Sequence, residues 1–150
     1  MASPKPGPQT TLRLTRTFAA PREKVFRAWT EPEELKKWWG PEGYATPTAE
    51  VDLRVGGRYR LGMMKLPNGD VFYLTGVYRE VRPPEKLVYT WRWESQPDLG
   101  ETLVTIEFRE RGDATEVVLR HELFPNADTR DDHSKGWSSC LDRLAKVLQR

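Results

Sequence analysis

The chain has 150 residues, a length typical of one domain, and a domain of this size buries enough surface to form a hydrophobic core. Charged residues make up 31% of the chain, but they are spread along it with a formal net charge of +2, which disfavours nucleic acid as a partner. The single cysteine excludes an intramolecular disulfide, and the lack of a run of about 18 apolar residues argues against membrane insertion.

The first residues, MASPKPGPQ, contain Pro, Ser and Gly where a signal peptide has its apolar segment. We therefore expect a disordered leader over residues 1–10, a single domain over residues 11–150, and a cytoplasmic protein. The alternation of apolar and polar residues over 12–18 predicts a first strand.

Two short helices are expected after this strand. Pro21 suits the first turn of a helix over 21–29, and Thr30 is the expected cap of a second helix with acids in its first turn. Gly40 and Pro41 end that second helix.

From about residue 46 the apolar period changes to two, which is typical of strands. Residues 51–55 and 59–63 are predicted to form a hairpin with Gly56 and Gly57 at its turn. Further strands are expected over 71–78, 87–93, 103–108 and 117–123. Several consecutive strands with short turns predict an antiparallel sheet.

The last stretch, residues 131–150, is the only long helical pattern in the sequence. Asp131 or Asp132 is the expected cap, and one narrow apolar stripe runs along the helix, formed by Trp137, Leu141, Leu144 and Leu148. Strands in a run with helices set apart from them predict an α+β fold. Because a sheet of about seven strands curls and one helix covers only part of it, we expect a cavity between the two.

This organisation resembles the helix-grip fold of the START-like (SRPBCC) superfamily, which includes the birch-pollen-allergen-like proteins. More specifically, it resembles the family of homologues of the activator of the heat-shock-protein-90 ATPase. Four segments carry the likeness: TRTFAAPREKVFRAWTEPEELKKWWGPEGY (15–44), DLRVGGRYRLGMMKLPNGD (52–70), GVYREVRPPEKLVYTWRW (76–93) and GWSSCLDRL (136–144). The resemblance implies the fold described above and a chaperone as a possible partner. Eukaryotic co-chaperones of this family carry a separate N-terminal domain where this chain has nine residues.

Aromatic residues are the most prominent candidates for a functional site. The chain has six tryptophans and five tyrosines, and aromatic walls with a few polar groups are typical of pockets for apolar ligands. The alternative is that these side chains fill the core. The predicted cavity residues are Trp38, Trp39, Tyr59, Met63, Tyr73, Trp91, Trp93, His121, Trp137 and Leu141.

The sequence offers little for catalysis or metal binding. His121 and His133 are the only histidines and have no metal-ligand spacing, so no metal or cofactor is predicted. His121 is interpreted as a hydrogen-bonded core histidine, with acid–base work as the alternative. Residues 138–140, Ser-Ser-Cys, lie within a helix and lack the context that activates a nucleophile.

Three hypotheses for function remain open. The first is a non-enzymatic domain, monomeric or homodimeric, that binds a small hydrophobic molecule between the last helix and the sheet. The second, which rests on the family resemblance, is a chaperone cofactor. The third is a cyclase- or hydrolase-like enzyme that uses the same cavity, as in related helix-grip proteins.

Overall fold

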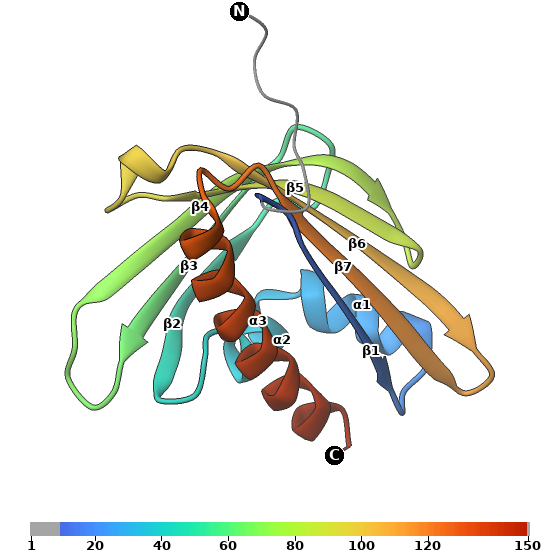
Figure 1. The fold of residues 1–150 in the computed structure, drawn as a ribbon. Helices are drawn as coiled ribbons and strands as arrows, with labels where there is room; N and C mark the ends of the chain where they lie inside the picture. The colour runs from blue at the N-terminus through green and yellow to red at the C-terminus, as the bar shows by residue number, and fades with distance from the viewer. Residues whose placement is uncertain (1–9, 150) are drawn as a thin grey trace, which may run out of the picture.

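The computed structural model describes residues 10–149 as a curled antiparallel sheet of seven strands with three α-helices (Figure 1). The order across the sheet is β1-β7-β6-β5-β4-β3-β2, so every neighbouring pair except β1–β7 is also consecutive in the chain. The strands are β1 (Leu12–Phe18), β2 (Tyr44–Val51), β3 (Arg58–Lys65), β4 (Val71–Arg82), β5 (Lys86–Trp93), β6 (Thr102–Arg111) and β7 (Ala114–Glu122).

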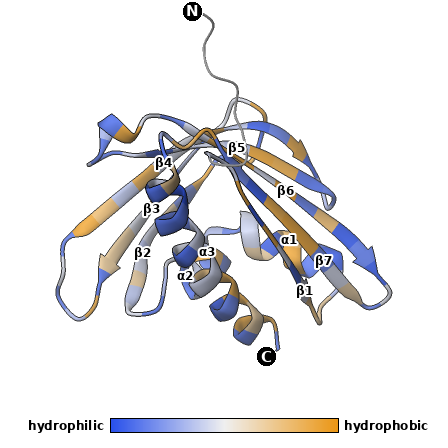
Figure 2. Ribbon diagram, viewed as in Figure 1, coloured by the Kyte–Doolittle hydropathy of each residue, from blue (hydrophilic) through white to orange (hydrophobic). Residues whose placement is uncertain are grey.

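The sheet forms a half-barrel, and the long helix α3 (Ala127–Leu148) runs diagonally across its open side (Figure 1). Helices α1 (Arg22–Thr30) and α2 (Pro32–Trp38) lie between the two wings of the sheet near the C-terminal end of α3. A short 3-10 helix, η2 (Pro97–Leu99), lies between β5 and β6. The apolar and polar residues alternate along several strands, as Figure 2 shows, and the core fills the concave side.

The predicted α+β helix-grip fold is confirmed, with two short helices after the first strand and a long C-terminal helix. The stripe on α3 is buried as expected: Trp137, Leu141, Leu144 and Leu148 are each at most 5% exposed. Full burial of such side chains typically contributes about 1.5–3 kcal/mol each, which explains why this helix is fixed against the sheet.

The predicted caps of two helices are wrong. Thr30 is the last residue of α1, and its hydroxyl donates to the Phe26 carbonyl at 3.0 Å instead of capping α2, which begins after Glu31. Helix α3 begins at Ala127, before the predicted start at 131, because the Asn126 side chain accepts a hydrogen bond from the Thr129 amide at 2.8 Å.

The predicted hairpin forms, but its first strand is misplaced: residues 59–63 lie in β3 as expected, whereas the partner of β3 is Tyr44–Val51 and not residues 51–55. Strand β2 ends at Val51, which pairs with Tyr59, and residues 52–57 form the connection in which Leu53 and Val55 are 38% and 64% exposed. The Gly56 amide donates to the Tyr78 carbonyl at 2.8 Å, so the connection is held against β4 and does not form a tight Gly-Gly turn. Pro47 lies within β2, where it is tolerated because β2 is an edge strand.

Residues 1–9 of the predicted leader and Arg150 lie outside the described residues, whereas the carbonyl of Thr10 accepts a hydrogen bond from the Phe124 amide at 3.2 Å.

Strand β7 ends at Glu122, and the next residue, Leu123, leaves the predicted strand with a φ of 73° and a 43% exposed side chain. Across residues 10–149, none of the helices is long and apolar enough to cross a membrane.

Candidate functional site

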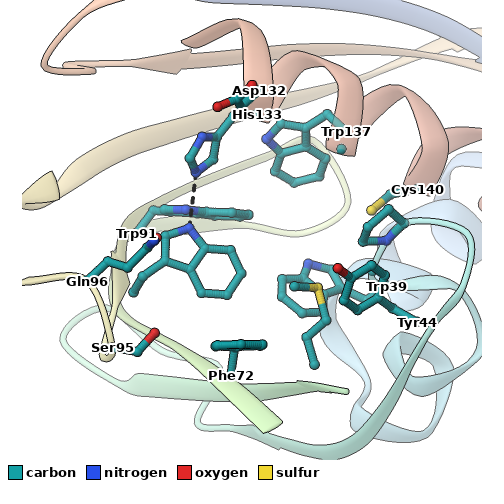
Figure 3. A pocket seen from close by; sticks show the side chains of 15 residues that line it. Trp39, Tyr44, Phe72, Trp91, Ser95, Gln96, Asp132, His133, Trp137 and Cys140 are labelled. Atoms are coloured by element: carbon teal, nitrogen blue, oxygen red, sulfur yellow. Dashed lines mark hydrogen bonds between the residues drawn. The ribbon is translucent and has the colours of Figure 1, made fainter. Parts of the chain in front are cut away.

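A pocket of about 330 Å³ lies between the first half of α3 and the sheet (Figure 3). Six aromatic side chains form much of its wall, with a small number of polar groups at its edge. The aromatic residues are Trp39, Tyr44, Phe72, Trp91, Trp93 and Trp137, and the others are Gly40, Pro41, Met63, Ser95, Gln96, Asp132, His133, Gly136 and Cys140. Its volume lies at the lower end of the range typical of small-molecule sites.

Helix α3 forms one wall through residues spaced by four. Asp132, Gly136 and Cys140 follow one another along one line of the helix, and His133 and Trp137 form the adjacent line. Gly136 has no side chain, so the helix backbone itself forms part of the wall, and a Cβ placed there would meet no atom within 4 Å.

Next to α3, the wall includes the loop after α2, residues 39–43, and the first residue of β2, Tyr44. Arg143 of α3 holds this loop, because one nitrogen of its guanidinium donates to the Gly40 carbonyl at 2.7 Å and to the Tyr44 carbonyl at 3.2 Å. The Ser139 hydroxyl accepts from the Glu42 amide at 2.8 Å. Two residues of α3 that do not line the pocket therefore fix the segment that carries Trp39 and Tyr44.

His133 lies at the rim with both ring nitrogens engaged. Its Nδ1 is 2.9 Å from the Thr129 carbonyl and therefore carries the proton, so Nε2 accepts a hydrogen bond from the Trp93 indole at 3.0 Å (Figure 3). Burial lowers the pKa of His133, while the Thr129 carbonyl and the Asp132 carboxylate oppose that shift. The ring is therefore neutral at pH 7.

His121 lies behind the pocket wall, fully buried next to Trp91 and Trp137. Its Nδ1 accepts from the Trp137 indole at 3.1 Å, so its Nε2 carries the proton and donates to the Thr102 hydroxyl at 2.7 Å. Burial, and to a smaller extent His133, holds the pKa of His121 well below its usual range. This arrangement matches the interpretation of His121 as a hydrogen-bonded core histidine.

Cys140 also lines the pocket, and its side chain is buried. Burial raises the pKa of its thiol to about 12, so the thiol remains protonated and unreactive at neutral pH. Within residues 10–149, no three His, Cys, Asp or Glu side chains gather closely enough to hold a metal ion.

Comparison with known proteins identifies the family of this chain. The family described as Activator of Hsp90 ATPase homolog 1-like protein matches residues 19–149. The chain belongs to this family. The resemblance to START-like proteins is thereby confirmed, as the structural neighbours are also of this type.

Several solved structures share the fold closely. A crystal structure of a protein from Chromobacterium violaceum is 31% identical, with a TM-score of 0.84 and coverage of 93% of this chain and 98% of that one. For a family member from Silicibacter pomeroyi the identity is 29%, the TM-score 0.83 and the coverage 93% and 97%. An HSP90 activator from Plasmodium falciparum is 25% identical, with a TM-score of 0.73 and coverage of 93% and 96%.

The human activator of 90 kDa heat shock protein ATPase homolog 1 is a more distant relative. It is 24% identical over 130 residues, which cover 87% of this chain and 34% of the human protein. The chain therefore spans about a third of the length of this family member.

The fold of the present chain brings five of the predicted cavity residues together. Trp39, Met63, Trp91, Trp93 and Trp137 line the pocket. Their role in binding a ligand stays a prediction, but they come from α3, the loop after α2 and two strands, and share one hollow.

The other five predicted residues lie outside this pocket. Trp38 is fully buried in the core, where its indole donates to the Ala28 carbonyl at 2.9 Å. Tyr59 lies in a tyrosine cluster deeper under the sheet, and its hydroxyl donates to the Thr90 carbonyl. Leu141 is 1% exposed and belongs to the core, as does His121.

Tyr73 is on the opposite face of the sheet. It alternates with Leu74, which is fully buried on the concave side, and the Arg60 guanidinium lies 3.7 Å from the centre of the Tyr73 ring. The period of two gave two possible faces for β4, and the buried face is that of Phe72 and Leu74.

The sequence analysis did not predict several residues of the pocket wall. His133 lies four positions before Trp137, so extending the apolar stripe of α3 by one turn would have found it. Pro41 and Tyr44 belong to the segment WWGPEGY, in which Gly40 and Pro41 predicted only the end of the second helix. Ser95, Gln96 and Asp132 carry no sequence signal that separates them from ordinary surface residues.

Proposed function

We propose that this chain binds a small, largely apolar molecule in the pocket between α3 and the sheet, without chemically changing it. The observation that carries the proposal is the pocket of about 330 Å³ with six aromatic side chains in its wall. Aromatic rings in a concave site offer large apolar contact area, which is the typical composition of a small-molecule pocket.

The hydrogen bonds of the site support a binding role over an enzymatic one. A general base needs a free lone pair, but both nitrogens of His133 are engaged with Thr129 and Trp93. A nucleophile needs a thiolate, but the pKa of Cys140 is raised to about 12 by burial. The His133 imidazole thus serves to hold the Trp93 indole in place.

The experiment that tests this proposal is a titration of isotope-labelled protein with small apolar probes such as indole, followed by two-dimensional NMR. We expect saturable shifts of amides in residues 39–44, 91–96 and 132–140. A second hollow near α1, lined by Lys24, Arg27, Glu31, Glu34, Lys37, Val147 and Leu148, provides an internal control whose amides should not shift. No saturable shift around the aromatic pocket would contradict the proposal.

A second candidate function is that of a chaperone cofactor. It is supported by the similarity to the human and Plasmodium falciparum proteins, whose names describe activators of the 90 kDa heat shock protein. The decisive measurement is the ATPase rate of the cognate chaperone with saturating amounts of this chain. An unchanged rate would reject this function and leave the ligand-binding proposal standing.

A further inference from the structure

We infer that the pocket selects compact organic cations with an apolar body, such as aryl-substituted amines and quaternary ammonium compounds, and disfavours organic anions. This inference rests on the proposed function, because it names the chemical class that the same pocket takes. It is carried by the charges of the wall and by the density of aromatic rings around them.

The charge of the wall has one sign. Among the fifteen residues that line the pocket in the described part of the chain, none is lysine or arginine, and Asp132 alone carries a full charge at pH 7. His133 is the only lining residue in the described part of the chain that could become a cation, and its hydrogen bonds and burial hold it neutral. An anionic head group would therefore meet a carboxylate and no cation.

The aromatic rings favour a cation independently of that carboxylate. The faces of aromatic rings carry partial negative charge, and Trp is the strongest of them. Trp93 stands nearly perpendicular to Trp91, at 87° with ring centres 5.7 Å apart, and Trp39 lies 6.2 Å from each of them. These rings pack against one another and line the same pocket, so a cation in it would lie next to several aromatic rings, the groups that bind quaternary ammonium ions.

Asp132 and these rings bound the same hollow. Figure 3 shows Asp132 and His133 at the helix side of the pocket, with Trp91 next to them and Phe72 across from them. The Asp132 carboxylate is close enough to act on the pKa of His133, so its field reaches the rim of the pocket.

Two nearby positive features do not reverse this charge. The Arg143 guanidinium does not line the pocket, and its charge acts on the pKa of the Cys140 thiol, whereas the Asp132 carboxylate acts on the pKa of His133 at the rim. The two charges therefore act on different parts of the wall. The positive end of the α3 dipole lies at Ala127, and its effect falls off within the first turn, before the residues that line the pocket begin at Asp132.

The test uses three probes with the same benzyl body and a tetrahedral head of different charge. These are benzyltrimethylammonium, its neutral isostere neopentylbenzene, and the anion phenylmethanesulfonate. Affinities are measured by isothermal titration calorimetry with the full chain at low ionic strength, where exposed charges are least screened. We expect the cation to bind about tenfold more tightly than the neutral probe, and the anion to bind most weakly.

Two variants separate the two contributions. Asp132→Asn keeps the shape and removes the charge, so we expect it to weaken the cation about threefold and to leave neopentylbenzene unchanged. Asp131→Asn is the matched control, since it changes the net charge equally at a neighbouring position outside the wall. Phe72→Leu, at a side chain that is already 40% exposed, should weaken the cation more than the neutral probe because it removes a ring.

Each outcome decides the inference. Equal or tighter binding of the neutral or anionic probe overturns it but leaves the proposed function standing, because the pocket still binds a small apolar molecule. Equal effects of Asp132→Asn and Asp131→Asn also overturn the assigned role of Asp132. If none of the three probes binds, the proposed function and this inference fall together.

Discussion

His121 of β7 and His133 of α3 are in contact, with ring centres 5.6 Å apart, and each accepts a hydrogen bond from a tryptophan indole. Indole donors require neutral acceptors, so both hydrogen bonds are lost when the imidazoles are protonated. The two rings thus tie the state of this region to pH.

This arrangement predicts how stability depends on pH. Because both pKa values are lower in the folded than in the unfolded chain, the unfolded state takes up protons first as the pH falls below about 6.5. The free energy of unfolding should be constant with respect to these groups above that pH. Below it, each histidine should lower this free energy by about 1.4 kcal/mol per pH unit until its folded pKa is reached.

Urea unfolding between pH 7.5 and pH 5 measures this dependence in a range where most carboxylates remain ionised. The variant His133→Gln is the control, since it removes one of the two titrating groups and should roughly halve the slope. A flat profile in the unmodified chain would show that the histidines are not held neutral.

Leu141 allows a test of which part of the stripe on α3 is packed core. The side chain is 1% exposed and does not line the pocket, so Leu141→Ala should cost about 2–5 kcal/mol and leave probe affinity unchanged. The neighbouring Cys140→Ala removes a single atom from the pocket wall and should cost less. Urea denaturation and calorimetry measure the two effects, and a small cost with changed affinity for Leu141→Ala would place it at the cavity.

At the scale of elements, the contact between α3 and the loop after α2 depends on Arg143. In Arg143→Met the chain keeps a side chain of similar length, but the carbonyls of Gly40 and Tyr44 lose their donor. Buried acceptors left without partners typically cost about 1–3 kcal/mol. We therefore expect lower stability and weaker binding of apolar probes.

Hydrogen exchange followed by NMR locates this effect. The amides of Tyr44 and Leu66 donate to carbonyls of Pro41 and Gly43 in the same loop, so both should exchange faster in the variant. Lys146→Met is the matched control, because Lys146 lies on the exposed face of the same helix. Unchanged exchange at Tyr44 and Leu66 would show that the loop holds its conformation without Arg143.

The same elements show what the sequence could predict. The alternation over 87–93 and the stripe from Trp137 to Leu148 indicated β5 and α3 correctly, since burial on one face imposes the period directly. The pattern failed at β2, where Pro47 interrupts it on an edge strand that tolerates proline. It also failed at the start of α3, where the cap is set by one side chain before the apolar stripe begins.

For the whole molecule, the pocket follows from geometry that the sequence anticipated only in outline. One helix crosses a half-barrel on a diagonal (Figure 1); near its C-terminal end α1 and α2 add to the core, whereas the aromatic pocket lies beside its first half. That a cavity exists could be expected from the number of strands. Which aromatic residues line it could not, because Trp38 and Trp39 are adjacent and only their placement in space separates core from wall.

The glycine at position 136 adds a consequence for the design of α3. An alanine at a helix interior is typically more stable than glycine by about 0.5–1 kcal/mol, and the methyl group of Gly136→Ala would meet no neighbour within 4 Å. We expect urea unfolding to show the variant as more stable and calorimetry to show weaker probe binding, because the methyl group narrows the pocket. Ser138→Ala, on the same helix outside the wall, should raise stability alone. Higher stability together with weaker probe binding would show that glycine at position 136 lowers the stability of α3 and enlarges the pocket. Unchanged affinity would show that the probes do not occupy the space beside Gly136.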